Sequence, residues 1–337
     1  MKALVLERPQ QASVRNICEP GLSENEILLK VRMVGLCGTD LSSFRGTNPL
    51  VSFPRILGHE VCASVVGGEG IGTVLTAGAD LALCPYKSCG TCTSCLGGRP
   101  NACQYNQTLG VQRDGALTEF IVMPREKLYP AKLSVTELSL VEPLAVAFHA
   151  VTRGGITAND TVAVFGCGGV GLGIVAAALF RGARTICVDV SDEKLELARL
   201  AGAKHTINSR HEPLHDRLWQ ITDGHGPDVA IEAVGSPATF RAAVEEVSFS
   251  GRVVYLGYTK EPVSYETRLF VQKELDIKGS RNAQPEDFRD AIRLLELHRF
   301  PTDLAVSLIV PLEEAANALR LWSENPSQFH KILVSLD

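Results

Sequence analysis

Residues 161–173 read TVAVFGCGGVGLG, and this stretch decides the fold of the middle of the chain. A short apolar run typical of a buried strand leads into three glycines spaced G-x-G-x-x-G, and an apolar segment of helical length follows. Gly166 permits a tight turn, Gly168 lets the backbone approach a pyrophosphate, and Gly171 lets helix and strand pack closely. The stretch therefore predicts a strand, a turn and a helix whose N-terminus faces phosphates.

An acidic residue completes this pattern at the end of the next apolar run. Residues 184–190, RTICVDV, are typical of a strand, and Asp189 stands near its end. In a dinucleotide-binding fold such a carboxylate accepts hydrogen bonds from the ribose hydroxyls and repels a 2′-phosphate. No Lys or Arg follows until Lys194, so we predict NAD rather than NADP. A tight strand–helix turn that binds no cofactor remains an alternative.

Strands and helices continue to alternate beyond this pair. Residues 191–202 predict a helix with a serine cap and a glycine stop, and residues 228–235, 251–258 and 275–280 predict further apolar strands. This alternation indicates βαβ units around a parallel sheet. We therefore predict an α/β fold class, with a doubly wound Rossmann domain in the second half of the chain.

The rest of the chain follows a different pattern. Residues 26–36, 61–68 and 117–123 are short β-type runs separated by Gly and Pro, which predicts an irregular β domain. Two amphipathic helices and a strand at 331–336 end the chain. We predict two domains: a discontinuous catalytic domain over 1–147 and 282–337, and a dinucleotide-binding domain over 148–281.

Composition excludes several classes of function. The 337 residues are 45% hydrophobic and 21% charged, and the net charge of −5 gives no electrostatic footprint for nucleic acid. The apolar runs are too short to span a membrane, and the N-terminus lacks the apolar core of a signal peptide. We therefore predict a cytoplasmic protein, in which ten cysteines serve as metal ligands or buried thiols rather than as disulfides.

Four of these cysteines gather in residues 87–103, KSCGTCTSCLGGRPNAC. The spacing C-x2-C-x2-C-x7-C differs from the bacterial ferredoxin run in its last gap and lacks the following proline. A zinc ion in a closed tetrahedron of thiolates fits best, and a closed site has no position for a substrate. Redox-active or plain buried thiols remain the alternative. The predicted structural zinc ligands are Cys89, Cys92, Cys95 and Cys103.

Two further motifs, VGLCGTD at 34–40 and PRILGHE at 54–60, place a Cys and a His–Glu pair after short strands. With the cysteine loop, EPL at 142–144 and GCGGVG at 166–171, the chain resembles the zinc-dependent medium-chain alcohol dehydrogenases over essentially its full length. Residues 142–173 are similar to the sorbitol dehydrogenase branch, and KGSRNAQPEDF at 278–288 is similar to its bacterial sugar-acid members, such as L-galactonate and L-gulonate 5-dehydrogenases. The resemblance implies a GroES-like catalytic domain beside the Rossmann domain.

The resemblance also implies a second, catalytic zinc. Cys37 and His59 match its ligands, and Glu60 and Glu142 match acids that approach the metal. Three protein ligands and one open position are typical of catalytic zinc, which lowers the pKa of a bound alcohol. For Glu142, an N-cap before Pro143 at the first helical position is the alternative.

Three more positions match the family's catalytic motif. Thr39 matches the hydroxyl that passes the proton outward, and Asp40 matches a group that orients a ligand. Ser42 stands where many members have a histidine that completes the proton relay. The family's G-D-R-V segment is also replaced, by GADLALCP at 78–85, which leaves the local loop geometry open.

The predicted cofactor site extends beyond the three glycines and the acid. It comprises Gly166, Gly168, Gly169, Val170, Gly171, Asp189, Lys194, Leu256, Ser280 and Arg281. The predicted substrate residues are Glu142, Arg281 and Asn282, because a cationic donor suits a polyol or, better, the carboxylate of a sugar acid. An interdomain salt bridge is the alternative role for Arg281.

The sequence therefore predicts an NAD-dependent enzyme with two zinc ions that oxidises a secondary alcohol of a polyol or sugar acid in a cleft between its domains. L-Threonine dehydrogenase activity and a non-catalytic structural or sensory role remain as rivals. Family members pair sheets across a dimer near residues 251–257, GRVVYLG, so we also predict a homodimer or homotetramer.

Overall fold

The computed structural model describes residues 1–68, 71–72 and 75–336. The chain divides into two compact units, each described here by itself. Unit 1 comprises Met1–Glu142, Gln284–Glu296 and Thr302–Asp337, and unit 2 comprises Pro143–Ala283 and Leu297–Pro301. Unit 1 is therefore discontinuous, because the last part of the chain returns to it.

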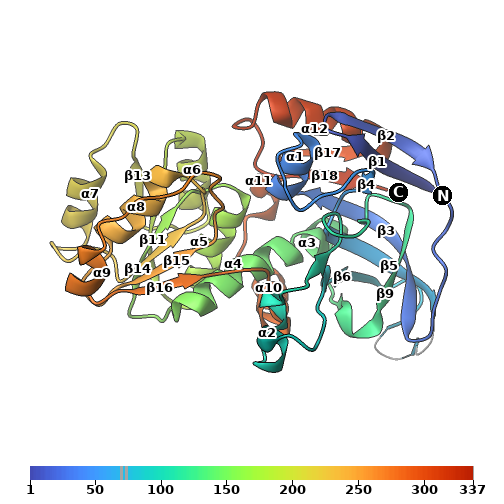
Figure 1. Cartoon of the computed structure of the whole chain (residues 1–337), viewed down its shortest axis with the longest axis horizontal. Coiled ribbons are helices and arrows are strands. Elements are labelled where there is room, and N and C mark those ends of the chain that lie inside the picture. The colour runs from blue at the N-terminus through green and yellow to red at the C-terminus, as the bar shows by residue number, and fades with distance from the viewer. Residues whose placement is uncertain (69–70, 73–74, 337) are drawn as a thin grey trace. The chain divides into compact units, whose positions relative to one another are not determined.

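Unit 2 is built on a six-stranded sheet in which every neighbouring pair is parallel (Figure 1). The strands are β11 (Thr161–Phe165), β12 (Arg184–Asp189), β13 (His205–Asn208), β14 (Val229–Glu232), β15 (Arg252–Tyr255) and β16 (Asp276–Gly279). Their order, β13-β12-β11-β14-β15-β16, is the 3-2-1-4-5-6 order of a Rossmann sheet. The predicted doubly wound parallel sheet is confirmed.

Helices flank this sheet, which explains why its strands are continuous apolar runs. They are α4 (Val141–Gly154), α5 (Gly169–Phe180), α6 (Asp192–Leu200), α7 (Leu214–Ile221), α8 (Pro237–Glu246) and α9 (Arg268–Gln272). Helix α5 packs on β11 and β12, and α8 packs on β14 and β15. All five side chains of β11 are buried, and Phe165 and Ile186 belong to the core that the helices cover.

One expectation about unit 2 needs correction. Residues 251–257 were predicted to lie where sheets pair across a dimer, but β15 has β14 on one side and β16 on the other. Its backbone groups are therefore already used within the sheet. Among the described strands, β16 forms the edge on this side, so any pairing across a dimer would involve β16.

The described residues of unit 1 form three sheets. Its strands are β1 (Lys2–Arg8), β2 (Gln11–Asn16), β3 (Glu26–Leu36), β4 (Arg55–Ile56), β5 (Glu60–Gly68), β6 (Asp80–Leu83), β7 (Tyr86–Lys87), β8 (Gln107–Thr108), β9 (Phe120–Pro124), β10 (Leu128–Pro130), β17 (Leu308–Pro311) and β18 (Ile332–Ser335). The largest sheet has the order β10-β6-β5-β3-β18-β17, with β9 also paired to β3. The GADLALCP segment that replaces the family's G-D-R-V contributes β6 to this sheet.

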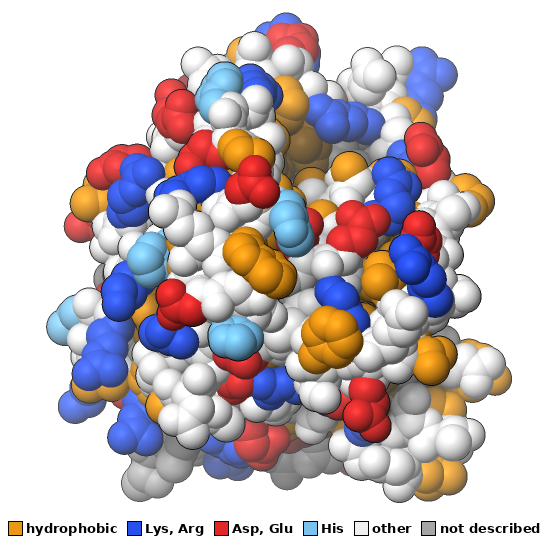
Figure 2. Space-filling view, turned by 90° about the vertical axis from the view of Figure 1, so that its left-hand side faces the viewer, with side chains coloured by type: hydrophobic (Ala, Val, Ile, Leu, Met, Phe, Trp, Pro, Cys, Tyr) orange, Lys and Arg blue, Asp and Glu red, His pale blue; other side chains and the backbone are white. Residues whose placement is uncertain are grey.

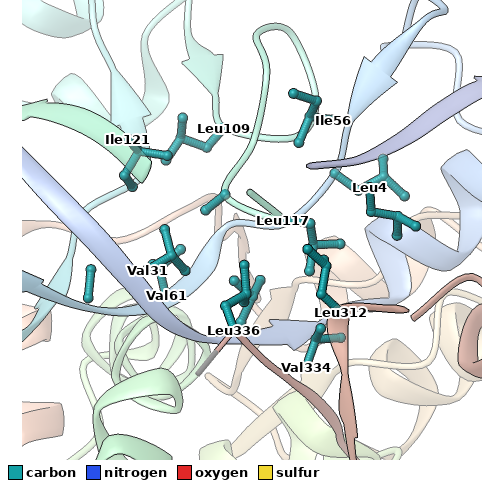
Figure 3. Close-up of a cluster of buried hydrophobic side chains, with 14 of the residues drawn as sticks. Leu4, Val31, Ile56, Val61, Leu109, Leu117, Ile121, Leu312, Val334 and Leu336 are labelled. Carbon is teal, nitrogen blue, oxygen red and sulfur yellow. The ribbon is translucent and has the colours of Figure 1, made fainter. Parts of the chain in front are cut away.

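Short helices complete unit 1. They are α1 (Gly38–Phe44), α2 (Thr93–Leu96), α3 (Val135–Ser139), α10 (Pro285–Glu296), α11 (Thr302–Ala305), α12 (Ala315–Glu324) and the 3-10 turns Pro100–Ala102, Arg125–Lys127 and Leu312–Glu314. Figure 3 shows part of the core, in which Leu4 of β1, Val31 of β3 and Val334 of β18 gather with other aliphatic side chains. The last strand is thus part of the same core as the first.

The C-terminal strand occupies a central place in the large sheet. Strand β18 runs antiparallel to β3, with Ile332 opposite Leu36, and parallel to β17. This register brings Lys331 beside the end of β3, where Cys37 follows.

One face of the molecule is drawn in space-filling form in Figure 2. On the face in Figure 2, positive, negative and apolar side chains intermingle. Over the described residues, no helix combines the length and apolar character that a membrane span requires.

Candidate active site

Cys37, His59 and Glu60 form one cluster, in which the candidate ligand atoms all lie within 4.8 Å of one another. Cys37 follows β3 directly and caps the N-terminus of α1, whereas His59 directly precedes β5 and Glu60 is its first residue. The two strands are antiparallel neighbours, and Gly35 lies opposite Glu60. Strand pairing therefore brings together two motifs that are separate in the sequence.

Asp40 connects the Cys37 segment to the His59 segment. Its carboxylate accepts hydrogen bonds from the backbone N–H of Cys37, at 2.9 Å, and from that of Gly58, at 3.1 Å. Its Oδ1 also lies 3.8 Å from Nδ1 of His59. Asp40 is fully buried, so water does not screen its electrostatic interactions with the Cys37 and His59 segments.

Glu142 is held by a phenol that the sequence did not point to. The carboxylate of Glu142 accepts a hydrogen bond from the hydroxyl of Tyr86, and both side chains are buried. Helix α4 already begins at Val141, so Glu142 is a helical residue and Pro143 is not the first one. The N-cap interpretation of Glu142 is therefore wrong.

Glu60 is held by a buried lysine from the other end of the chain. Nζ of Lys331 donates to both carboxylate oxygens of Glu60, at 2.7 and 2.6 Å, and lies 3.4 Å from the carbonyl oxygen of Leu36. Three donors thus meet three acceptors. The carboxylate packs so tightly on β3 that a Cβ at Gly35 would lie 2.1 Å from Oε2, which explains the glycine.

The charge balance of this cluster favours a bound cation. The acids Asp40, Glu60 and Glu142 are all buried near the Cys37 thiol, whereas among the described residues Lys331 is the sole buried Lys or Arg. Burial raises the pKa of Glu142 to about 7, although His59 opposes that shift. Burial by itself would lower the pKa of His59. Asp40, followed by Cys37, raises this pKa by more than burial lowers it, so that it lies well above its usual value. Glu142 and His59 thus retain protons at a position where a divalent cation would fit.

The two predicted relay hydroxyls lie on α1. Thr39 and Ser42 are half-buried. The Ser42 hydroxyl donates to the backbone carbonyl of Thr39 at 2.9 Å, and the neighbouring Ser43 hydroxyl donates to the same oxygen at 2.7 Å. The Ser42 proton is therefore directed to the helix backbone in this structure.

The four-cysteine loop forms a second, separate cluster, made of Cys89, Cys92, Cys95 and Cys103. Three sulfur–sulfur distances are 3.5 Å for Cys92–Cys95, 3.9 Å for Cys92–Cys103 and 3.5 Å for Cys103–Cys89. Zinc–sulfur bonds of about 2.3 Å give tetrahedron edges of about 3.8 Å, whereas a disulfide needs about 2.05 Å. The loop therefore has the dimensions of a tetrahedral thiolate site, and no disulfide joins any of the four cysteines.

Backbone amides of this loop stabilise negative charge on the cysteine sulfurs. The N–H groups of Cys92 and Cys89 donate to the sulfurs of Cys89 and Cys103, each at 3.3 Å. Hydrogen bonds from the Thr91 and Cys92 amides lower the pKa of Cys89 to about 6. Burial, followed by its contact with Cys92, raises the pKa of Cys95 to about 12, so a cation is needed before all four can ionise.

The glycine loop of unit 2 has the geometry that its sequence predicts. Gly166 has a φ of +92°, and a Cβ at Gly171 would lie 1.8 Å from the carbonyl oxygen of Gly166. Gly168 caps α5, and a Cβ there would meet nothing within 4 Å. The helix N-terminus, with Gly169 and Val170 in its first turn, therefore opens onto free space that suits a phosphate.

Asp189 lies at the end of β12 beside this loop. Its Oδ2 accepts from the N–H of Cys167 at 2.8 Å, and its Oδ1 accepts from the N–H groups of Val190 and Ser191 at 2.7 and 3.0 Å. The carboxylate thus fixes the glycine loop to the end of β12. A carboxylate offers about four acceptor positions, which leaves room for a ribose hydroxyl.

The other predicted cofactor and substrate residues also lie in unit 2. Lys194 is in the first turn of α6, Leu256 follows β15, and Ser280 follows β16. Arg281 and Asn282 come next and are half-buried, and Asn282 has a φ of +53°. Their roles remain predictions.

Family models match both units. The model "Alcohol dehydrogenase GroES-like domain" matches residues 23–133, and the model "Zinc-binding dehydrogenase" matches residues 169–296. A zinc-type alcohol dehydrogenase-like protein of Haemophilus influenzae is 34% identical, with 98% of each chain covered. This chain belongs to the zinc-dependent alcohol dehydrogenase family. The resemblance drawn from the motifs is confirmed, as are the GroES-like and Rossmann folds and the assignment as an enzyme.

Two more relatives of this alcohol dehydrogenase are informative. L-Galactonate-5-dehydrogenase of Escherichia coli is 32% identical, with 94% of this chain and 93% of the relative covered. The crystal structure of an Escherichia coli alcohol dehydrogenase complexed with NADH has a TM-score of 0.91 and 30% identity, and covers 100% of this chain and 99% of its own. The polyol and sugar dehydrogenases are thus the part of the family to which this dehydrogenase is similar.

Three buried residues of this alcohol dehydrogenase were not found from the sequence. They are Tyr86, Lys331 and Glu232. Glu232, at the end of β14, accepts hydrogen bonds from the N–H groups of Val234 and Gly235 at 2.9 and 2.8 Å. In the sequence, Glu232 borders an apolar strand in EAVG, and Lys331 borders one in KILVSL. This was the one usable signal, and it is weak because a charged residue in such a position is more often exposed to solvent.

Proposed function

We propose that this chain oxidises a secondary alcohol of a polyol or sugar acid to the ketone and transfers the hydride to NAD. The observation that supports this most is the Cys37–His59–Glu60 cluster in a chain that also carries the Gly166–Gly171 loop and Asp189. The buried Glu142 interacts electrostatically with His59 and Glu60. Unit 1 would be the catalytic domain and unit 2 the dinucleotide-binding domain.

Cys37 and His59 would hold the catalytic zinc, with Glu60 or Glu142 as the third protein ligand. A zinc ion there would lower the pKa of an alcohol hydroxyl and stabilise negative charge on its oxygen while the hydride leaves the carbon that bears it. Asp40 would keep His59 oriented, since its Oδ1 lies 3.8 Å from Nδ1. Thr39 would pass the alcohol proton outward, releasing its own hydroxyl proton to water as it accepts that of the alcohol. Ser42 would contribute little to this transfer, because its hydroxyl is bound to the Thr39 carbonyl.

Cys89, Cys92, Cys95 and Cys103 would hold the second zinc, and their role would be structural. All four ligand positions are filled by thiolates, so no position is left for a substrate. The predicted total is thus two zinc ions per chain.

NAD would bind at the carboxyl edge of the unit 2 sheet. The N-terminus of α5, with Gly166, Gly168, Gly169, Val170 and Gly171, would face its pyrophosphate. Asp189 would accept from the ribose hydroxyls, and Lys194, Leu256, Ser280 and Arg281 would complete the site. A carboxylate disfavours a 2′-phosphate, so we expect kcat/KM with NAD to exceed that with NADP by roughly a hundredfold.

A sugar acid is the substrate class that we favour. Arg281 and Asn282 would contact it, because a guanidinium matches a carboxylate in a bidentate geometry. The relative named L-galactonate-5-dehydrogenase supports this choice. The test is a panel of L-galactonate, L-gulonate, hexitols and L-threonine with NAD, followed by NADH absorbance.

Each outcome of the panel has a clear meaning. Oxidation of an aldonate or hexitol supports the proposal, and preferred oxidation of L-threonine would favour an L-threonine 3-dehydrogenase instead. No turnover by zinc-loaded protein with any secondary alcohol would favour a non-catalytic homologue. We also propose a homodimer or homotetramer, to be checked by light scattering, and a cytoplasmic location, which suits ten cysteines that form no disulfide.

A further inference from the structure

We propose that Tyr86 is a positioning residue for Glu142: its hydroxyl fixes the rotation of the carboxylate, and an aromatic contact with Phe288 of α10 fixes the Tyr86 ring. This inference rests on the proposed function, because it takes Glu142 to act at the catalytic metal. No motif of the family resemblance described above includes Tyr86, whereas Phe288 is the last residue of the motif KGSRNAQPEDF.

The hydroxyl contact is specific. Oη of Tyr86 donates to Oε1 of Glu142, and the exposed fractions of the two side chains are both 5%. A buried carboxylate oxygen that loses its donor is not compensated by water, and the cost of such a loss is large. One oxygen of Glu142 is therefore committed to the phenol, which restricts how the carboxylate can turn.

The ring of Tyr86 is itself held by a second aromatic side chain. The ring of Phe288 meets it edge to face, with centroids 6.4 Å apart and planes at 67°. Phe288 is fully buried and stacks in turn on Tyr129 of β10, at 4.8 Å and 13°. These are favoured geometries for aromatic pairs, and they limit rotation of the Tyr86 ring.

The support comes from segments that are far apart in the chain. Tyr86 lies in β7, Glu142 opens α4, and Phe288 lies in α10, which belongs to the part of unit 1 that follows unit 2 in the sequence. The chain's return to unit 1 therefore contributes to the orientation of a carboxylate at the candidate metal cluster. A helix that served only to cover a surface would not need an aromatic contact with a residue bonded to Glu142.

A carboxylate that approaches a metal must present its free oxygen within about half an ångström of the productive position. Lys331 already engages both oxygens of Glu60, at 2.7 and 2.6 Å, so the two acids are held differently. Glu60 is bound by a cation, and Glu142 is bound through one oxygen by a neutral donor. Tyr86 thereby keeps Glu142 in place without neutralising its charge.

The test compares Tyr86→Phe with Tyr129→Phe in zinc-loaded and cobalt-substituted protein. Both changes remove one hydroxyl from the same aromatic group, but only the first removes the donor to Glu142. We expect Tyr86→Phe to shift the visible bands of cobalt at the Cys37 cluster and to lower kcat by roughly tenfold to hundredfold, with KM changed less. Tyr129→Phe should leave the bands and kcat within about twofold of the parent.

A third variant tests the ring contact. Phe288→Leu keeps the Tyr86 hydroxyl but removes its aromatic support, so we expect a smaller cobalt shift in the same direction. Thermal unfolding of each variant separates this effect from general destabilisation. If Phe288→Leu does not fold, Phe288→Tyr, which keeps the ring, serves as the conservative variant and should retain the parent bands.

Two results would overturn the inference. One is a Tyr86→Phe protein whose cobalt bands and kcat match those of the parent, which would reduce Tyr86 to a packing residue. The other is an equal shift in Tyr129→Phe, which would make the effect unspecific. If the parent oxidises no alcohol of the panel, the proposed function fails, whereas the cobalt bands still report whether Tyr86 orients Glu142.

Discussion

The two cysteine-containing clusters of unit 1 are assembled in different ways. The loop cluster takes all four sulfurs from Cys89–Cys103, with backbone amides of the same loop supporting the sulfurs. The Cys37 cluster takes its groups from the end of β3 and the start of β5, and it is supported by Tyr86 and Lys331 from distant segments. A local, four-sulfur site is closed and suits a structural ion, whereas a mixed and non-local site keeps a position for chemistry.

The largest expected effect separates these roles. Cys37→Ala should lower turnover by more than about a thousandfold, because the catalytic zinc loses a ligand, while NAD affinity stays within about twofold. Steady-state NADH formation and a fluorescence titration with NAD measure the two quantities. Cys18→Ala, an exposed thiol of neither cluster, is the control and should match the parent. Turnover retained in Cys37→Ala would remove Cys37 from the mechanism.

Cys103→Ala tests the other side of the comparison. Cys103 is fully buried, and loss of its sulfur should cost one zinc and roughly 3–5 kcal/mol of unfolding free energy. Turnover per folded molecule should stay within about threefold of the parent. Metal analysis and urea unfolding provide the measurements. A loss of turnover as large as that of Cys37→Ala, at full folding, would mean that the loop takes part in chemistry.

Lys331→Met tests the charge balance that only the Cys37 cluster has. It leaves Glu60 buried without its partner, so the unfolding free energy should fall by about 3 kcal/mol. Adding Glu60→Gln should recover part of the loss, because the uncompensated charge is then gone. Lys2→Met breaks an exposed pair with Glu313 and should leave the free energy of unfolding nearly unchanged. Equal effects of both lysine changes would contradict the account.

The pH dependence of zinc-free protein gives a smaller effect. Burial raises the pKa of Glu142 from 4.5 to about 7, so the folded state keeps a proton that the unfolded chain has released. This stabilisation is fully present below pH 4.5 and is lost as pH rises through 7, by about 3 kcal/mol. Urea unfolding of Glu142→Gln should show a flatter pH profile than the parent. Identical profiles would place the proton elsewhere.

Ser42→Ala should give the smallest effect. Its hydroxyl donates to the Thr39 carbonyl, so its removal should change kcat by less than about twofold. Thr39→Val should lower kcat tenfold or more, since Thr39 is the proposed relay for the alcohol proton. The kcat values of both variants with the best alcohol of the panel decide the matter. A loss of tenfold or more in Ser42→Ala would return Ser42 to the relay.

The difference between the clusters also explains what the sequence could predict. Ligand spacing within one loop, and the glycines of 166–171, act through local geometry, so they can be recognised from residue order alone. Tyr86 and Lys331 act through tertiary contacts, and the apolar run that follows Lys331 is only a weak sign of a buried partner. Lys331 meets Glu60 only because β18 pairs with β3 in one particular register. The edge position of β16 likewise depends on the sheet order rather than on the apolar pattern of any one strand.

Anomalous X-ray scattering at the zinc edge, from crystals of the purified protein, tests the central claim most directly. Two peaks per chain are expected. One should be surrounded by the sulfurs of Cys89, Cys92, Cys95 and Cys103, and the other should contact Cys37, His59 and a carboxylate of Glu60 or Glu142. A peak confined to the four-cysteine loop, with none in contact with Cys37 in protein that turns over, would contradict the account.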